Sequence, residues 1–122
     1  MGTDSTWAIL TGALVADALA GYWLSRLGRP LNSLVMTLHK LIGLGAGVAL
    51  IILLVQGRRS ASLSTAATAA AVATGVLLLL AAASGGVLSA AKSVPKPVLR
   101  LHQVLPLLAV AGAAVTLWLV VS

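Results

Sequence analysis

The sequence contains no cysteine, only two acidic residues, and few charges of either sign. The lack of cysteine excludes disulfides, thiolate metal sites, iron–sulfur clusters and cysteine nucleophiles. Charged residues make up 8% of the 122 positions, against about 25% in a soluble domain, and mean hydropathy is +1.10. A chain this short cannot hide so much apolar surface from water. These shortages exclude a soluble enzyme and a disordered chain, and they predict that lipid surrounds most residues.

Four long apolar segments predict membrane spans at about 6–25, 34–55, 65–89 and 98–121. Each has the roughly 20 apolar residues that a helix needs to cross about 30 Å of hydrocarbon. Leucine and alanine dominate without strand-like alternation, which favours helices over barrel strands. The short connections make neighbouring helices antiparallel, and we expect the serines between 60 and 64 to cap the third helix. The predicted fold is a single all-α transmembrane domain over 1–122, an up-down-up-down four-helix bundle.

Basic residues predict the orientation. Six of them flank the first and third connections: Arg26, Arg29, Lys40, Lys92, Lys96 and Arg100. Only Arg58 and Arg59 flank the second. The excess of basic residues around the first and third connections predicts that these loops lie in the cytoplasm and that both termini lie outside. The composition favours the plasma (inner) membrane of a bacterium. No aromatic stacking platform or basic groove accompanies the net charge of +6, so no nucleic-acid partner is expected.

The two halves of the chain resemble each other. Residues 21–25 (GYWLS) close the first span and residues 85–89 (GGVLS) close the third, at an offset of 64. Each is followed by a basic, proline-containing loop and then by a histidine, in TLHKL at 37–41 and RLHQV at 100–104. The pattern predicts two pseudo-repeated helical hairpins of the same orientation, related by an axis along the membrane normal.

The chain has two histidines, His39 and His102, each about one turn inside an even-numbered span at the same end. Because these spans run in the same direction and lie diagonally across the bundle, we expect both imidazoles at one depth. Two neutral imidazoles on opposite sides can hold a metal between them, and haem iron with two axial histidines is the candidate. Zinc or non-haem iron is disfavoured because only Asp17 is available as a further ligand.

Haem is large and flat, so it needs helices with little side chain beside it. The glycines near the level of the histidines are Gly21, Gly43, Gly47, Gly85 and Gly86. We expect these glycines to let the porphyrin approach the backbone, although such spacing is also typical of helix packing. The basic side chains expected to pair with the haem propionates are Arg26, Arg29, Lys40, Lys96 and Arg100.

With these residues the chain resembles membrane b-type cytochromes, whose four-helix bundles hold haem between histidines of the second and fourth helices. The resemblance implies that His39 and His102 are metal ligands, with Gly21 and Gly85 or Gly86 as packing glycines. Dihaem relatives carry two histidines on each ligand helix, whereas this chain has one, which implies one haem b per chain. The implied function is electron transfer with a quinone or a partner redox protein, rather than that of a stand-alone enzyme.

Asp17 is the only acid within a span and shares a helix face with Gly21. We expect Asp17 to serve as a proton relay, as a hydrogen-bond partner of a ligand, as a quinone contact, or as a neutral acid with a structural role. Two alternative functions stay open: a small proton-coupled transporter or channel that uses Asp17, and a structural subunit of a membrane complex. We expect Trp7 and Trp118 to be interfacial anchors. We expect Pro106 to kink the last helix.

Overall fold

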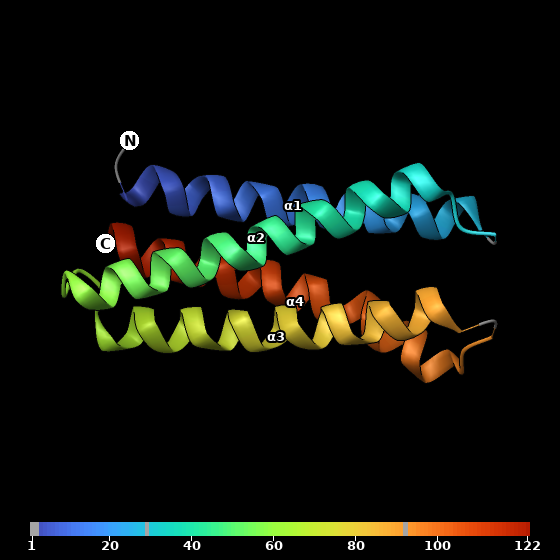
Figure 1. Cartoon of the computed structure of the whole chain (residues 1–122). Coiled ribbons are helices and arrows are strands. Elements are labelled where there is room, and N and C mark those ends of the chain that lie inside the picture. Colours follow the sequence, from blue (N-terminus) through green and yellow to red (C-terminus); the bar gives the residue numbers. More distant parts are fainter. Residues whose placement is uncertain (1–2, 29, 92) are drawn as a thin grey trace.

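The structure is a computed structural model that describes residues 3–28, 30–91 and 93–122. It contains four helices, α1 (Thr3–Leu27), α2 (Ser33–Arg59), α3 (Thr65–Ala90) and α4 (Lys96–Val121), and the described residues form no strand (Figure 1). The predicted all-α four-helix bundle is therefore confirmed. Each helix begins or ends a few residues beyond the predicted span, because the polar and basic flanks also adopt helical conformation.

Side chains and loop residues set the helix ends. Asn32 accepts a hydrogen bond from Val35 N at 3.0 Å, and Ser64 accepts one from Ala67 N at 3.0 Å, so each caps the start of its helix. The predicted role of the serines before α3 is confirmed at Ser64. Gly28 follows α1 with a φ of +73°, a left-handed conformation that favours glycine. These caps keep the connections short and the neighbouring helices antiparallel.

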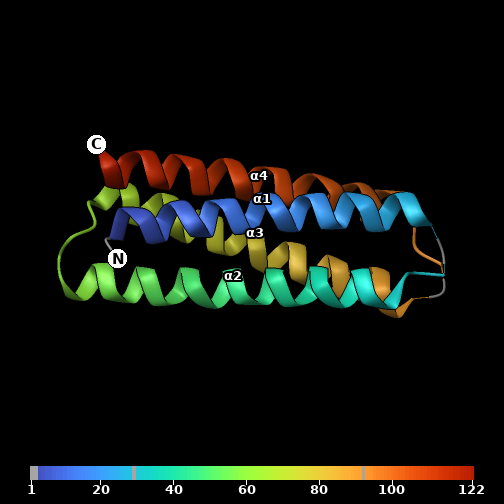
Figure 2. The same cartoon turned by 90° about the horizontal axis from the view of Figure 1, so that it is seen from above.

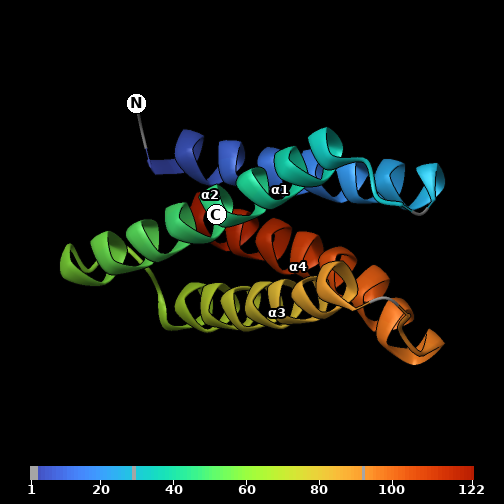
Figure 3. The same ribbon diagram turned by 45° about the vertical axis from the view of Figure 1, so that its right-hand side comes forward.

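Consecutive helices run in opposite directions, so both termini lie at one end of the bundle and the first and third loops lie at the other (Figures 1 and 2). Contacts join α1 to α2, α2 to α3, α3 to α4 and α1 to α4. Figure 3 shows α4 lying between α1 and α3. Because α2 and α4 are not among the contacting pairs, they are diagonal in the bundle, as the sequence predicts for the two histidine-bearing spans.

All four helices are long and apolar enough to cross a membrane. Their outer faces carry large apolar side chains that no other element covers; those exposed by more than 60% are Leu19, Tyr22, Leu34, Leu44, Ile51, Leu79, Leu107 and Trp118. Water would not stabilise such a surface, whereas hydrocarbon would. The chain is therefore a multi-pass membrane protein in a lipid bilayer.

Small residues pack α3 against α4. The buried positions of these helices along the bundle are Ala67, Ala71, Thr74, Ala81, Ser84, Leu105, Ala109, Ala113 and Thr116. Gly112 of α4 lies directly against the hydroxyl of Thr74, which itself donates to Ala70 O at 2.8 Å. Small side chains let helix backbones approach closely, and dispersion contacts then hold the pair without help from water. This half of the bundle is a tight scaffold for the residues at its loop end.

Trp7 is not an interfacial anchor, and that prediction is wrong. Its side chain is 1% exposed and packs in the apolar core near the chain termini. The reason is helical spacing, since Trp7, Leu10 and Leu14 fall on one face of α1 and all three point toward the bundle axis. Trp118, by contrast, is 66% exposed near the end of α4, as expected of an anchor.

We predict that Gly112→Val destabilises the bundle by about 1–3 kcal/mol, because a β-carbon there meets the Thr74 hydroxyl and the core must shift to admit it. The matched control is Gly12→Val on α1, where a β-carbon meets no atom within 4 Å. Thermal unfolding in detergent, followed by circular dichroism, measures both. Equal unfolding temperatures for the two variants would contradict the described α3–α4 packing.

Candidate functional site

The two histidines meet across the bundle. His39 on α2 and His102 on α4 have ring centroids 6.2 Å apart, and their ring planes are inclined at 79°. The prediction that they lie at one level on diagonal helices is confirmed. Both rings are half-buried and line a common cavity. Two side chains from helices that do not themselves touch thus converge on the bundle axis.

Asp17 of α1 holds the His39 ring. Its Oδ1 lies 2.8 Å from His39 Nδ1 and its backbone carbonyl lies 3.1 Å from the same nitrogen. The side chains are only 17% and 15% exposed, which keeps water from competing for this contact. Both oxygens accept hydrogen bonds, so Nδ1 carries the proton and donates it. Of the roles predicted for Asp17, the hydrogen-bond partner of a candidate ligand is the one that this contact supports.

Ser84 of α3 holds the His102 ring in the same way. Its Oγ lies 2.9 Å from His102 Nδ1 and donates to Ala81 O at 3.0 Å. Because the hydroxyl proton is used on Ala81, the oxygen accepts from Nδ1–H. Sequence reasoning missed Ser84. The available signal was a serine directly before Gly85 in an otherwise apolar stretch of α3.

These hydrogen bonds fix the chemistry of both rings. With the proton on Nδ1, a neutral imidazole carries its lone pair on Nε2. No hydrogen bond joins either Nε2 to another residue in the part of the chain that the structure describes. Metal-bound histidines characteristically donate their second nitrogen to a carboxylate, hydroxyl or carbonyl in this manner. The pair therefore presents two oriented nitrogen lone pairs at one level of the bundle.

Glycines make room for the rings and for Asp17. A β-carbon on Gly21 would lie 2.9 Å from His39 Cε1, and one on Gly85 would lie 2.8 Å from His102 Cε1. A β-carbon on Gly43 would lie 2.8 Å from Asp17 Oδ2. The first helix of each hairpin thus supplies a glycine on which the histidine of its second helix rests. This correspondence supports the pseudo-repeat, and it assigns the space at Gly21 and Gly85 to the imidazoles themselves.

A cavity of about 1230 Å³ surrounds the histidine pair and is lined by residues of all four helices. We call it the histidine cavity. Gly47 and Gly86 line it, and a β-carbon on either would meet no atom within 4 Å. Its volume exceeds the 300–1,000 Å³ or so typical of pockets for small organic ligands. The cavity is large enough for an extended flat molecule, and Gly47 and Gly86 leave backbone exposed to it.

Basic side chains lie at the loop end of the histidine cavity. Arg26 and Lys40 line it, and Lys40 Nζ also donates to Ser89 Oγ on α3 at 3.2 Å. Arg100 is exposed on α4 and is not among the lining residues. Arg29, a further predicted partner of a bound anion, lies outside the described residues. Cationic groups suited to an anionic ligand thus come from α1 and α2.

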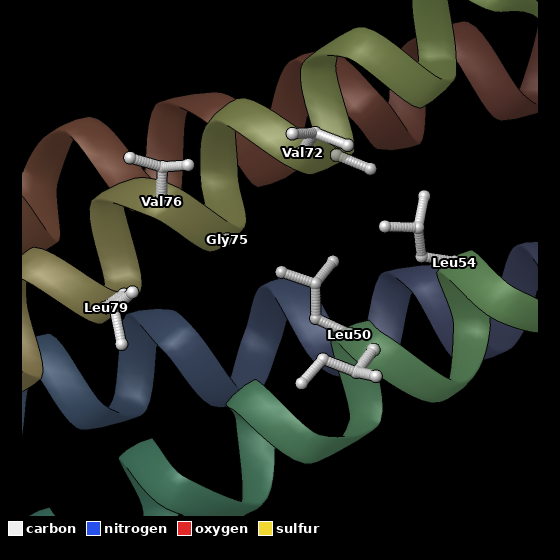
Figure 4. Close-up of a pocket in the computed structure, with 8 residues that line it drawn as sticks. Leu50, Leu54, Val72, Gly75, Val76 and Leu79 are labelled. Carbon is white, nitrogen blue, oxygen red and sulfur yellow. The ribbon is translucent and has the colours of Figure 1, made fainter.

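An apolar groove of about 300 Å³ lies between α2 and α3 and is lined by Leu50 and Leu54 of α2 and by Val72 and Val76 of α3 (Figure 4). We call it the α2–α3 groove. It shares Leu50, Ile51, Gly75 and Leu79 with the histidine cavity, so the two spaces adjoin each other. Ile51 and Leu79 are 62% and 70% exposed on the outer face. The groove therefore lies between the histidine cavity and the lipid-facing surface.

The donor set fits haem better than a bare metal ion. The described residues contain no group of three or more histidine, cysteine, aspartate or glutamate side chains placed to hold a metal ion. A metal bound by these two imidazoles would take its other ligands from elsewhere, and porphyrin supplies four of them in haem. Two imidazoles bound at about 2 Å on opposite sides of one metal have ring centroids about 6 Å apart. The 6.2 Å observed here fits that arrangement.

No protein-family model matches the sequence, and comparisons with curated proteins and with solved structures found no match.

Because Asp17 holds His39 and Ser84 holds His102, we predict that mutating either partner changes only the histidine that it holds. In protein carrying isotope-labelled histidine, Ser84→Ala is expected to shift the Nδ1 resonance of His102 and to leave that of His39 in place, since only His102 loses its acceptor. Asp17→Asn is expected to do the reverse. Thr74→Ala, which removes another buried hydroxyl of α3, is the control and should move neither. Nitrogen NMR measures the shifts; if Ser84→Ala moved only His39, the assignment would fail.

Proposed function

We propose that this protein is a membrane-embedded b-type cytochrome that binds one haem b per chain through His39 and His102 and transfers electrons. The observation that carries the proposal is the convergence of two imidazoles, 6.2 Å apart, each with its Nδ1 already hydrogen-bonded. Two rings oriented by second partners and facing one cavity are the arrangement that axial ligation requires.

Each neighbouring residue has a role in holding the group. Asp17 and Ser84 orient the ligand rings, Gly21 and Gly85 accommodate them, and Gly43 accommodates the Asp17 carboxylate. Gly86 would let the macrocycle approach α3. Bound haem supplies a one-electron couple whose potential depends on its axial ligands and on burial. The protein's part is to hold the iron, exclude water and fix the two imidazoles.

Basic side chains at the loop end of the histidine cavity favour a haem orientation in which the propionates point toward that end. Arg26 and Lys40 line the histidine cavity there, and charge-assisted hydrogen bonds to carboxylates are about twice as strong as neutral ones. The haem propionates would pair with these side chains. Arg100 can contribute only from the exposed surface of α4, as long-range attraction that salt screens.

A single haem near one face does not span the bilayer by itself, so we infer that electrons enter and leave at the histidine end. The partner is a quinone or a redox protein. The α2–α3 groove supports a quinone, because it offers a membrane-soluble molecule an apolar space beside the histidine cavity. A redox protein would instead approach the basic loop end.

We further propose a bacterial plasma (inner) membrane, with loops one and three in the cytoplasm and the termini outside. The first and third loops share one end of the bundle (Figure 2), and six of the eight basic residues flank them in the sequence. The positive-inside rule favours this end for the cytoplasm. The haem and its propionates would then face the cytoplasm.

The contact between Asp17 and His39 also bears on the transporter alternative. A carrier that uses Asp17 as its proton site needs that carboxylate open to a water-filled path on each side in turn. Here one carboxylate oxygen is bonded to His39 and the other rests against Gly43. The pairing with a ring that faces a second histidine favours the cytochrome.

Reconstitution with haem is expected to give the absorption spectrum of low-spin iron with two histidine ligands. His39→Ala and His102→Ala should each abolish that spectrum, because each removes one of the two axial nitrogens. Gln56→Ala, at the far end of α2, is the matched control and should leave it unchanged. An unaltered low-spin spectrum in either histidine variant would disprove the two-ligand proposal.

The orientation predicts opposite labelling of two new cysteines in a chain that has no native one. Ser93→Cys, in the third loop, should react with a membrane-impermeant maleimide only in inverted vesicles. Ser62→Cys, in the second loop, should react in intact spheroplasts, because that loop faces outside. Both serines are exposed, so burial does not limit their reaction. The reverse labelling pattern would overturn the proposed orientation while leaving the haem proposal standing.

A further inference from the structure

The two histidines are not supported equally. His39 Nδ1 lies against a carboxylate oxygen at 2.8 Å and a backbone carbonyl at 3.1 Å, both from Asp17. His102 Nδ1 lies 2.9 Å from a neutral acceptor, Ser84 Oγ, and the backbone of Ala81 also accepts from this ring, so neither of its acceptors is charged. A hydrogen bond to a carboxylate is roughly twice as strong as one to a hydroxyl, and it makes the imidazole a more basic ligand. His39 is therefore the better-held and stronger donor of the pair.

The helix backbone next to each ring also supports His39 more firmly than His102. Four residues after His102 stands Pro106, which has no amide to donate to the His102 carbonyl, although α4 continues through it. The corresponding residue after His39 is Gly43, which keeps its amide and packs against the Asp17 carboxylate. The His102 turn thus lacks one helical hydrogen bond, while the His39 turn is braced by its partner. Displacing His102 disturbs fewer interactions than displacing His39.

Space is available on the His102 side as well. Gly86 and Ala82 of α3 and Pro106 of α4 line the histidine cavity near this ring, and a β-carbon on Gly86 would meet no atom within 4 Å. A diatomic molecule is smaller than the imidazole that it would replace. The α2–α3 groove lies between the histidine cavity and the bilayer, where such an apolar molecule dissolves readily.

We propose that His102 is an exchangeable ligand, and that the α4 side of the haem binds a small neutral molecule of the carbon monoxide class while His39 stays coordinated. This inference rests on the proposed function. The exchange breaks the bond between iron and His102 Nε2 and forms one between iron and the carbon of the incoming molecule. No electron or proton is transferred in this step. The protein would thereby respond to a dissolved gas as well as transfer electrons.

The test is the rate at which carbon monoxide binds to the reduced, haem-loaded protein, measured by stopped-flow absorption. Because the imidazole must leave first, the rate reports how firmly the departing histidine is held. Ser84→Ala is expected to raise the rate by about tenfold, within the range seen when hydrogen-bond partners of metal ligands are removed. Asp17→Asn should raise it much less, since it loosens the ring that stays.

Two controls separate a specific effect from a general one. Ser84→Thr keeps the hydroxyl and should bind carbon monoxide at close to the parental rate. Thr74→Ala removes a buried hydroxyl of α3 that bonds only Ala70 O, and it should also match the parent. The spectrum before gas is added shows that each variant has bound haem. Absence of haem in the parent protein would refute the proposed function rather than the exchange.

Two results would overturn the exchange at His102. One is a larger acceleration in Asp17→Asn than in Ser84→Ala, which would make His39 the departing ligand. The other is a low-spin reduced spectrum that carbon monoxide leaves unchanged in both the parent protein and Ser84→Ala.

Discussion

The site depends on one interaction made twice, a hydrogen bond that fixes the Nδ1 proton of a half-buried histidine. In hydrocarbon an unpaired polar group costs several kcal/mol, so each ring requires a partner and turns toward it. Asp17 provides that partner for His39 and Ser84 provides it for His102. Once Nδ1 is bonded to a residue of α1 or α3, Nε2 is the nitrogen left for a ligand in the histidine cavity. The same need for satisfied polar groups that makes histidine expensive in a membrane therefore fixes the tautomer of both rings.

Packing of small residues makes this convergence possible. Glycines at 21, 43 and 85 leave no side chain where the imidazoles and the carboxylate lie. The close α3–α4 interface, with Gly112 against Thr74, holds these two helices together along the bundle. The α1–α2 hairpin repeats the glycine–histidine arrangement but replaces a hydroxyl with a carboxylate. A near-symmetric scaffold thus carries two histidines with chemically different partners, which is the basis for expecting unequal bond strengths at the iron of the proposed haem.

Sequence reasoning predicted the elements whose signals are periodic or compositional. Four spans, their antiparallel order, the level of His39 and His102, and the glycines beside them followed from hydropathy, loop length and a 64-residue repeat. Sequence reasoning failed for residues whose contacts depend on the direction in which they face around the helix axis. Trp7 faces the core because it shares a face with Leu10 and Leu14, and Ser84 reaches His102 because α3 turns that face inward. Arg100 lay within the predicted anion site but is exposed outside the cavity. A single sequence gives spacing along a helix, whereas neighbouring helices determine which side faces them.

The most direct test of the central claim is X-ray absorption at the iron edge of the haem-loaded protein. Joint ligation by His39 and His102 predicts six nitrogen neighbours at about 2 Å, two of them with the multiple scattering characteristic of imidazole. A five-coordinate iron, a sulfur neighbour, or the multiple scattering of only one imidazole would contradict the account.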